Sequence, residues 1–380
     1  MHKSSVTIAA ISIMICASCT GTGKTTEQSN AGEQYTLMVG SYSEPSDKAL
    51  RVYRFSTADT TAVMSGALPV SNCSFFTDIT PGGIIYALSE QDSATSSVVS
   101  VRFIDGDDMP QVTGRQAVGA ESPCYIQIVD SFAVTANYNG ASAAIFPILP
   151  DGTLGERSEM LRFSGSGPVE GRQDAPHPHC IAVTPDGKFM LVNDLGTDRI
   201  HTFPILPTST SPVDASAMTD VRINAGNGPR HIVFNSKGDR AYLINEVSDS
   251  VTVLGYKNGI LTPLQYIAAD TVGAHGAADT HLSPDGRFLY ASLRLLNDGI
   301  ATFSVNPSTG LIEHIGHTPT GGHPRNFTLS PDGSLMLVAA RDADAVEIYA
   351  IDKETGLPTA TGRNISVPRP VCVKFIRKID

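Results

Sequence analysis

The chain has 380 residues, 41% of them hydrophobic, and is long enough to bury a sizeable core. With 27 Lys plus Arg against 38 Asp plus Glu, its formal net charge of -11 argues against nucleic acid or an anionic membrane surface as a partner. No apolar run reaches the roughly 18 residues of a transmembrane helix, and 34 Gly with 24 Pro favour a turn-rich β protein.

The N-terminal segment has the pattern of an export signal. Lys3 precedes an apolar run at 6–15, and small residues then lead to Cys19 and a polar stretch. Small residues just before a cysteine resemble the lipobox of bacterial lipoproteins. On this interpretation Cys19 is the lipidated first residue of the mature chain.

These features divide the chain into a signal peptide at 1–18, a flexible tether at 19–33 and a globular domain at 34–380. We therefore expect an exported protein, periplasmic or anchored at the outer membrane, that touches the membrane only through its lipid. An ordinary signal peptide and an unprocessed cytoplasmic start are the alternatives.

Four later cysteines have a spacing that fits no zinc pattern: Cys73, Cys124, Cys180 and Cys372. An oxidising compartment would allow disulfides among them. Buried free thiols are the expected state, because each cysteine is flanked by apolar or strand-like residues.

Tight turns with a glycine recur through the second half of the chain. They occupy 184–187, 235–238, 283–286 and 330–333, and their glycines are 51, 48 and 47 residues apart. Short runs of β-type residues flank each turn, which is typical of a hairpin whose glycine has a positive φ.

Weaker copies of the turn at 80–83 and 129–131 bring the number of hairpins to six. Joining residues 35–40 to residues 371–375 completes a seventh. Repeats of about fifty residues with about four short strands each are typical of propellers. We predict an all-β, seven-bladed β-propeller of four-stranded antiparallel blades, with the ring closed by the N- and C-terminal strands.

Positions equally far from the turns should lie on one face of such a propeller. Eight residues before the turn glycines are His179, Arg230 and Arg325. Eight residues after them are Glu90, Glu246, Arg294 and Arg341, with Asp194 one residue out of register. These groups are expected to converge near the axis if the hairpins are the inner strands of their blades.

Such a ring suits a small anion whose reaction builds negative charge on oxygen. Arginine binds carboxylate or phosphate and stabilises an oxyanion, while His or Glu takes a proton from water. For any single residue, ion pairing across blades is the alternative interpretation. Asp186, Asp285 and Asp332 lie in the turns, so we assign them to structure.

Several segments also resemble a known family: 39–42, 136–140, 177–180, 193–199, 228–231, 245–246, 277–287 and 324–327. They are similar to the seven-bladed propeller lactonases, which include bacterial 6-phosphogluconolactonase of the cycloisomerase type and fungal carboxymuconate lactonising enzyme. The resemblance covers nearly the whole mature chain and implies a carboxylic ester hydrolase without a cofactor.

By this resemblance the catalytic residues are His179, Arg230, Glu246 and Arg294, and the substrate-binding residues are His177, His231, Arg325 and Asp194. The implied reaction opens a sugar lactone, as in the conversion of 6-phosphogluconolactone to 6-phosphogluconate. Water would be activated by Glu246 or His179, and the anion would be held by arginine.

Three alternatives stay open on sequence alone. Six-bladed lactonases use calcium, and Glu246, Asn193, Asn245 and Asp194 could supply oxygen ligands, although an arginine ring would repel a cation. An exported enzyme would meet an unphosphorylated aldonolactone or a uronic lactone sooner than a cytosolic phosphate ester. A non-catalytic propeller would instead bind a small anion, a polysaccharide fragment or a protein.

The oligomeric state follows from the expected closure of the ring. A closed propeller has few free strand edges, so we expect a monomer.

Overall fold

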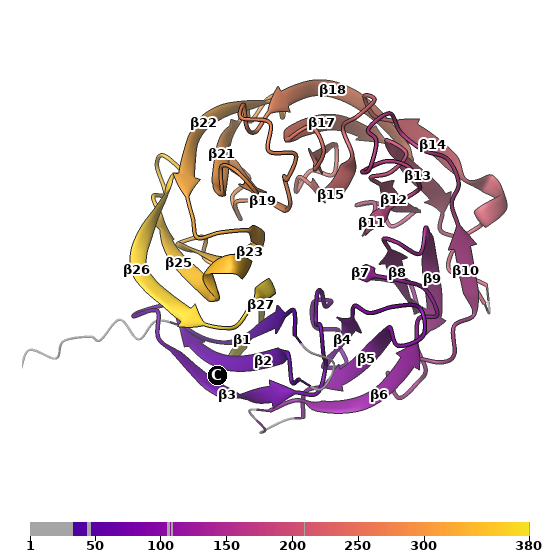
Figure 1. The fold of residues 1–380 in the computed structure, drawn as a ribbon, viewed down its shortest axis with the longest axis horizontal. Helices are drawn as coiled ribbons and strands as arrows, with labels where there is room; N and C mark the ends of the chain where they lie inside the picture. The colour runs from indigo at the N-terminus through magenta and orange to yellow at the C-terminus, as the bar shows by residue number, and fades with distance from the viewer. Residues whose placement is uncertain (1–32, 44–46, 105–106, 108, 209, 380) are drawn as a thin grey trace, which may run out of the picture. The chain divides into compact units, whose positions relative to one another are not determined.

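In the computed structural model, antiparallel sheets surround a central axis as the blades of a propeller (Figure 1). The structure describes residues 33–379 apart from 44–46, 105–106, 108 and 209. The predicted signal peptide and Cys19 lie outside the described residues. No helix in the described part is long and apolar enough to cross a membrane.

The strands are given from the axis outward for each blade. Blade 1 holds β27 (Pro370–Ile379), β1 (Gln34–Ser41), β2 (Leu50–Ser56) and β3 (Ala62–Leu68). Blade 2 holds β4 (Ile84–Ser89), β5 (Ser97–Arg102) and β6 (Gln111–Ala117). Blade 3 holds β7 (Pro123–Val129), β8 (Phe132–Asn137), β9 (Ser142–Pro147) and β10 (Glu159–Arg162).

The remaining four blades are each built from consecutive strands. Blade 4 holds β11 (Pro178–Val183), β12 (Phe189–Asp194), β13 (Arg199–Pro204) and β14 (Thr219–Arg222). Blade 5 holds β15 (Pro229–Phe234), β16 (Arg240–Asn245), β17 (Ser250–Lys257) and β18 (Ile260–Ala268). Blade 6 holds β19 (Thr280–Leu282), β20 (Phe288–Leu293), β21 (Gly299–Val305) and β22 (Ile312–Pro319). Blade 7 holds β23 (Pro324–Leu329), β24 (Leu335–Ala340), β25 (Ala345–Ile351) and β26 (Pro358–Ser366), and two 3-10 turns, η1 (Ala215–Ala217) and η2 (Arg341–Ala343), complete the described elements.

Ring closure follows the prediction. The C-terminal strand β27 pairs antiparallel with β1, with Val39 opposite Val373 and Gly40 opposite Cys372. The two ends of the propeller thus share one sheet, and the main-chain hydrogen bonds that close the ring lie within blade 1.

Blade 2 departs from the predicted four strands. Its innermost position is filled by a segment that makes a single bridge, Phe76 to Ala87. The Thr77 hydroxyl accepts the hydrogen bond from Tyr86 N at 3.1 Å, which replaces a main-chain acceptor there. A side-chain acceptor in the ladder interrupts the regular strand, but the segment still occupies the inner place.

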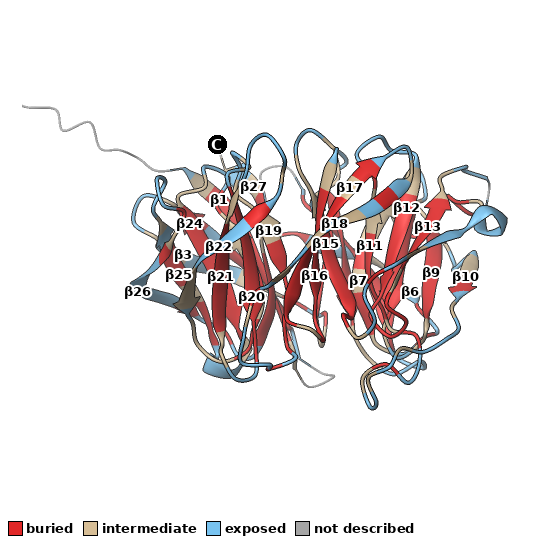
Figure 2. Ribbon diagram, turned by 90° about the horizontal axis from the view of Figure 1, so that it is seen from above, coloured by how far each residue is buried: buried red, intermediate tan, exposed pale blue. Residues whose placement is uncertain are grey.

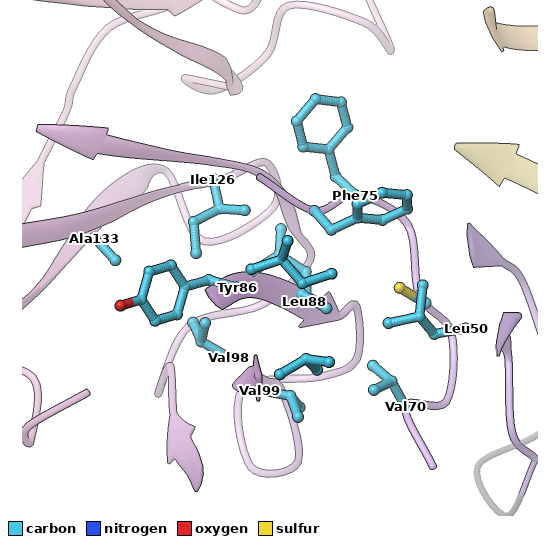
Figure 3. Packing of buried hydrophobic residues seen from close by; sticks show 14 of the residues in the cluster. Leu50, Val70, Phe75, Tyr86, Leu88, Val98, Val99, Ile126 and Ala133 are labelled. Carbon is cyan, nitrogen blue, oxygen red and sulfur yellow. The ribbon is translucent and has the colours of Figure 1, made fainter. Parts of the chain in front are cut away.

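The core is divided among the interfaces between neighbouring blades. Six clusters of buried apolar side chains lie between or across adjacent sheets, while the loops at both ends of the blades are exposed (Figure 2). In the cluster of blades 1 to 3, Tyr86, Val98 and Ile126 pack together with Phe75 nearby (Figure 3). Each blade is therefore stabilised by its neighbours rather than by a core of its own.

The tight turns are the inner hairpin connections of blades 4 to 7, as predicted. Their glycines, Gly187, Gly238, Gly286 and Gly333, have φ values of 69, 70, 72 and 69°. These conformations strongly favour glycine, which explains the sequence repeat. The four cysteines at 73, 124, 180 and 372 are buried free thiols.

Candidate active site

The inner strands begin with irregular pairing at the end of the blades opposite these turns. Register shifts fall between Pro178 and Cys180, between Pro229 and Ile232, and between Pro324 and Asn326. The residues inside the shifts include His179, Arg230 and Arg325. A β-bulge re-aims a side chain, so this irregularity directs the three predicted residues away from the ordinary strand alternation.

Arg230, Glu246 and Arg294 form one buried ion-pair cluster. Arg230 Nε donates to Glu246 Oε2 at 2.7 Å, and Arg294 Nη2 lies 3.1 Å from the same oxygen. Arg172 Nη2 pairs with the other oxygen, Oε1, at 2.5 Å. The two arginines on Oε2 are 1% and 5% exposed, so their charges depend on this carboxylate for compensation.

The cluster keeps Glu246 ionised. Burial would raise the pKa of Glu246, but the surrounding guanidinium charges, Arg294 before Arg230, lower it to about 2. Burial lowers the pKa of Arg294 to about 10, against the opposing effect of Glu246. At neutral pH the cluster therefore consists of a carboxylate and three guanidinium cations.

A second buried carboxylate, Asp279, orients Arg230 through a histidine. Asp279 Oδ1 pairs with His231 Nδ1 at 2.7 Å, and His231 Nε2 lies 3.3 Å from Arg230 Nη1. Burial, followed by the charge of Arg230, lowers the pKa of His231 to about 4. Neutral His231 thus donates from Nδ1 and accepts at Nε2, because Arg230 is only a donor.

His179 lies beside this hydrogen-bonded chain of side chains and has a ring nitrogen without a partner. Its ring centroid is 5.3 Å from that of His231 and 5.6 Å from that of Tyr138. Its Nδ1 is buried and has no hydrogen-bond partner among the described residues. Burial and then the charge of Arg230 hold the pKa of His179 well below its usual value, so its imidazole is neutral.

Arg325 has a half-buried side chain over the ring of Tyr42, 5.6 Å from the centroid. Within the described part of the chain, no acceptor is found for its guanidinium. Burial opposes the charge, but Tyr42 and then Glu90 raise the pKa of Arg325. The Tyr42 hydroxyl lies 3.3 Å from both carboxylate oxygens of Glu90. Arg325 is thus a charged group whose N–H donors are available to a ligand.

The other predicted residues have different surroundings. His177 stacks on Tyr138 with centroids 4.2 Å apart, and its ring Nδ1 is 3.1 Å from Tyr138 O. Asp194 is fully buried, and its Oδ1 accepts from His177 N and Gly196 N at 2.7 and 3.0 Å. This carboxylate holds the backbone that leads to His179. Arg341 pairs with Asp342 rather than with Glu246.

No group of three or more His, Cys, Asp or Glu side chains in the described residues is arranged to hold a metal ion. Among the oxygen donors considered from the sequence, Glu246 is occupied by three guanidinium groups and Asp194 by backbone amides.

Sequence reasoning missed Arg172 and Asp279 as members of the site. Asp279 lies one residue beyond Ala278, the position eight before Gly286, so a one-residue allowance in the counting would have found it. Arg172 lies in the connection between β10 and β11, outside the hairpins from which positions were counted. No sequence signal marked it.

Comparison with known proteins places this geometry in a family. The family described as Lactonase, 7-bladed beta-propeller, matches residues 36–375. A curated 6-phosphogluconolactonase from Formosa agariphila is 33% identical over 84% of this chain and 93% of its own length. The chain belongs to the seven-bladed β-propeller lactonase family, a family of lactone hydrolases.

Solved structures agree with this assignment. A putative 6-phosphogluconolactonase from Bacteroides fragilis is 38% identical, with a TM-score of 0.88 over 92% of this chain and 99% of that one. A periplasmic gluconolactonase from Pseudomonas aeruginosa is 29% identical, with a TM-score of 0.83 over 90% of this chain and 99% of that one.

Proposed function

We propose that this protein hydrolyses a sugar lactone, with 6-phosphogluconolactone as its reference substrate and 6-phosphogluconate as the product. The observation that carries the proposal is the guanidinium of Arg325, for which no hydrogen-bond acceptor is found among the described residues, close to the neutral imidazole of His179, whose Nδ1 has no partner. A cation for an oxyanion beside a proton acceptor for water is the combination that ester hydrolysis requires.

Arg325 and Arg230 are the groups suited to the oxyanion. Both charges lower the pKa of His179, so both guanidinium groups lie near its ring. As water adds to the lactone carbonyl carbon, negative charge develops on the carbonyl oxygen, and donors already in place stabilise it. Arg230 and Arg294 each also donate to a main-chain carbonyl oxygen, that of Ala278 and that of Gly276 respectively, so Arg325 has the most unused donors.

His179 suits the role of general base better than Glu246. Both carboxylate oxygens of Glu246 are ion-paired, whereas Nδ1 of His179 has no hydrogen-bond partner among the described residues. The neutral His179 ring can take the proton from water and return it to the ring oxygen as the lactone C–O bond breaks. An anionic substrate would offset the arginine charges and thereby raise the pKa of His179.

The test is proton release on 6-phosphogluconolactone, gluconolactone and uronic lactones, after subtraction of spontaneous hydrolysis. His179→Gln should lower kcat about 10²- to 10⁴-fold because the proton acceptor is lost. His314→Gln is the matched control, because His314 lies on the outer strand β22 away from the cluster. If His179→Gln keeps the wild-type kcat on any lactone, His179 is excluded as the base.

Glu246→Gln tests the role of Glu246 as the counter-charge of the buried arginines. We expect loss of activity, because two buried arginines lose their counter-charge, together with a fall of about 3 kcal/mol in the free energy of unfolding. Circular dichroism would establish that the variant is folded. Folded wild-type protein that opens no lactone would favour the alternative of a non-catalytic binding propeller.

An unphosphorylated gluconolactone is the second candidate substrate. The predicted export signal and the name of the periplasmic gluconolactonase from Pseudomonas aeruginosa support it. A higher kcat/KM for gluconolactone than for its 6-phosphate would make this the better description.

We also propose export with a lipid on Cys19, on the strength of the lipobox-like sequence. Intact-mass spectrometry of membrane-extracted protein should give a chain that begins at Cys19 and carries acyl groups. An unlipidated chain of full length would contradict this proposal.

A further inference from the structure

The connection from β10 to β11 carries an arginine to Glu246. Next to Arg172, the fully buried Gln173 donates from Nε2 to Leu195 O and to Asp198 Oδ1, both at 2.8 Å. Gln173 N also donates to Val169 O at 2.8 Å. These bonds hold the backbone beside Arg172, so its side chain starts from a defined position.

Arg172 joins parts of three blades. From the segment before blade 4, Nη2 reaches Glu246 of blade 5 at 2.5 Å, and Nη1 donates to His275 O before blade 6 at 3.1 Å. Its side chain is 32% exposed, whereas those of Arg230 and Arg294 are 1% and 5% exposed. Arg172 is therefore the arginine of the cluster that meets solvent.

In this arrangement one oxygen of Glu246 can exchange its arginine partner for a substrate group. Oε2 is held by the buried pair Arg230 and Arg294, while Oε1 pairs with Arg172. A sugar hydroxyl that hydrogen-bonds to Glu246 must therefore share or replace the contact with Arg172. Replacement is least costly at this position, because water already reaches the Arg172 guanidinium.

The site also carries an excess of positive charge. Four guanidinium groups, those of Arg172, Arg230, Arg294 and Arg325, surround the carboxylates of Glu246 and Glu90. Asp279 adds a third carboxylate, because its charge acts on Arg230, so with neutral histidines one positive charge lacks a carboxylate partner. A bound anion would supply the missing counter-charge.

We propose that Arg172 is a specificity-determining residue that binds the anionic substituent of the lactone at the solvent side of the site, exchanging Glu246 Oε1 for the substrate. A substrate hydroxyl then takes the vacated oxygen, while Arg325 and His179 act on the lactone group. This inference rests on the proposed lactone hydrolysis, and it assigns the recognition of a phosphate or carboxylate to a residue outside the repeat.

The experiment compares Arg172→Gln with wild type on 6-phosphogluconolactone and on neutral gluconolactone. We expect kcat/KM for the phosphorylated lactone to fall about 10- to 100-fold, mainly through KM, because a charge-assisted hydrogen bond is lost. For gluconolactone kcat/KM should fall less than for the phosphorylated lactone, because only the contact between Arg172 and Glu246 is then lost. Arg172→Lys should restore part of the loss, because it keeps the charge without the planar fork.

Arg341→Gln is the matched control. The Arg341 side chain is 29% exposed, similar to that of Arg172, and pairs with Asp342 rather than Glu246. Its substitution therefore removes the same charge from a side chain of similar exposure. We expect less than about a 3-fold change on both lactones. Equal losses on the two lactones in Arg172→Gln, or equal losses in both arginine variants on the phosphorylated lactone, would overturn the proposal.

Binding separates this inference from the proposed function. If wild type opens neither lactone, the proposed function fails, and calorimetry with 6-phosphogluconate and gluconate still tests Arg172. Tighter binding of 6-phosphogluconate by wild type that disappears in Arg172→Gln would support its role. Equal affinities of wild type and Arg172→Gln for 6-phosphogluconate would overturn it.

Discussion

Asp279 is the buried carboxylate through which several blades are linked at the axis. It pairs with His231 of blade 5, with His281 of its own blade 6 at 3.0 Å, and with Asn326 of blade 7 at 2.5 Å. Asn326 in turn accepts from Val373 N of blade 1 at 2.8 Å. Burial would raise the pKa of Asp279, but its histidine partners hold it well below the usual value.

Asp279→Asn should therefore damage both stability and positioning. We expect a loss of about 3 kcal/mol in the free energy of unfolding, because a hydrogen-bonded buried charge is removed. We also expect a fall of about 10-fold in kcat/KM, because His231 no longer has a fixed acceptor for Nδ1 and Arg230 loses its orienting partner. Nitrogen NMR shifts of the His231 ring should report a changed tautomer.

Asp78→Asn is the control for this substitution. Asp78 pairs with Lys374 at 3.0 Å, but its side chain is 87% exposed, so the change should cost less than about 1 kcal/mol and leave kcat/KM unchanged. An Asp279→Asn protein with wild-type activity and an unchanged His231 tautomer would show that the carboxylate does not position Arg230.

At the scale of the elements, a repeated tyrosine joins one blade to the next. The hydroxyls of Tyr86, Tyr242 and Tyr290 donate to Gly152 O, Gly310 O and Gly356 O, each at 2.9 Å. The tyrosines lie on β4, β16 and β20, and the glycines lie in turns of the following blades. The same contact thus supports three interfaces between blades.

Tyr242→Phe should lower the free energy of unfolding by about 1 kcal/mol, because Gly310 O loses an internal donor. Urea denaturation measures the change. Lactone turnover should stay at its wild-type value, because this contact lies at the end of the blades opposite Glu246. Tyr53→Phe removes a hydroxyl from another buried tyrosine ring without breaking such a bond and should change stability less. Equal losses in the two variants would mean that the bond between blades contributes nothing of its own.

The inner strands show what the repeat itself predicted. Turns with positive-φ glycines, hairpins beside the axis and the pairing of β27 with β1 all follow the sequence pattern. The bulges at His179 and Arg230 were not visible in it, although they decide how these side chains are aimed. A bulge depends on the pairing of two strands, which one strand's residues do not reveal.

For the whole molecule, the buried neutral histidines make stability depend on pH. Burial lowers the pKa of His231 to about 4 and that of His323 to about 3, whereas the unfolded chain binds these protons near pH 6.5. Below pH 6.5 the unfolded state therefore binds protons that the folded state does not, so the free energy of unfolding decreases as the pH is lowered. Glu246, with its pKa lowered to about 2, adds a further loss below about pH 4.5.

We expect the thermal midpoint to fall steadily from pH 6.5 to pH 4. His231 alone accounts for about 3 kcal/mol over this interval. His231→Gln should show a shallower decline, because its side chain does not titrate. Scanning calorimetry of both proteins at several pH values would measure the two slopes, and identical slopes would contradict the buried neutral state of His231.

The sequence by itself determined the propeller, its seven blades and the face on which His179, Arg230, Glu246 and Arg294 meet. It did so because each blade repeats one turn, and a fixed number of residues along an extended strand is a fixed distance from that turn. Arg325 lies on the same face by the same rule, since it takes the place in β23 that Arg230 takes in β15.

Only the tertiary structure decided which charges pair and which groups are free. Arg172 meets Glu246 from 74 residues away and from outside the repeat. Asp279 and His231 hold equivalent positions 48 residues apart in successive repeats, but the repeat did not specify that the two side chains pair. The lowered pKa of Glu246, the neutrality of His179 and the unused donors of Arg325 all depend on these contacts. Charge states are set by burial and by neighbours in space, which spacing along the chain does not specify.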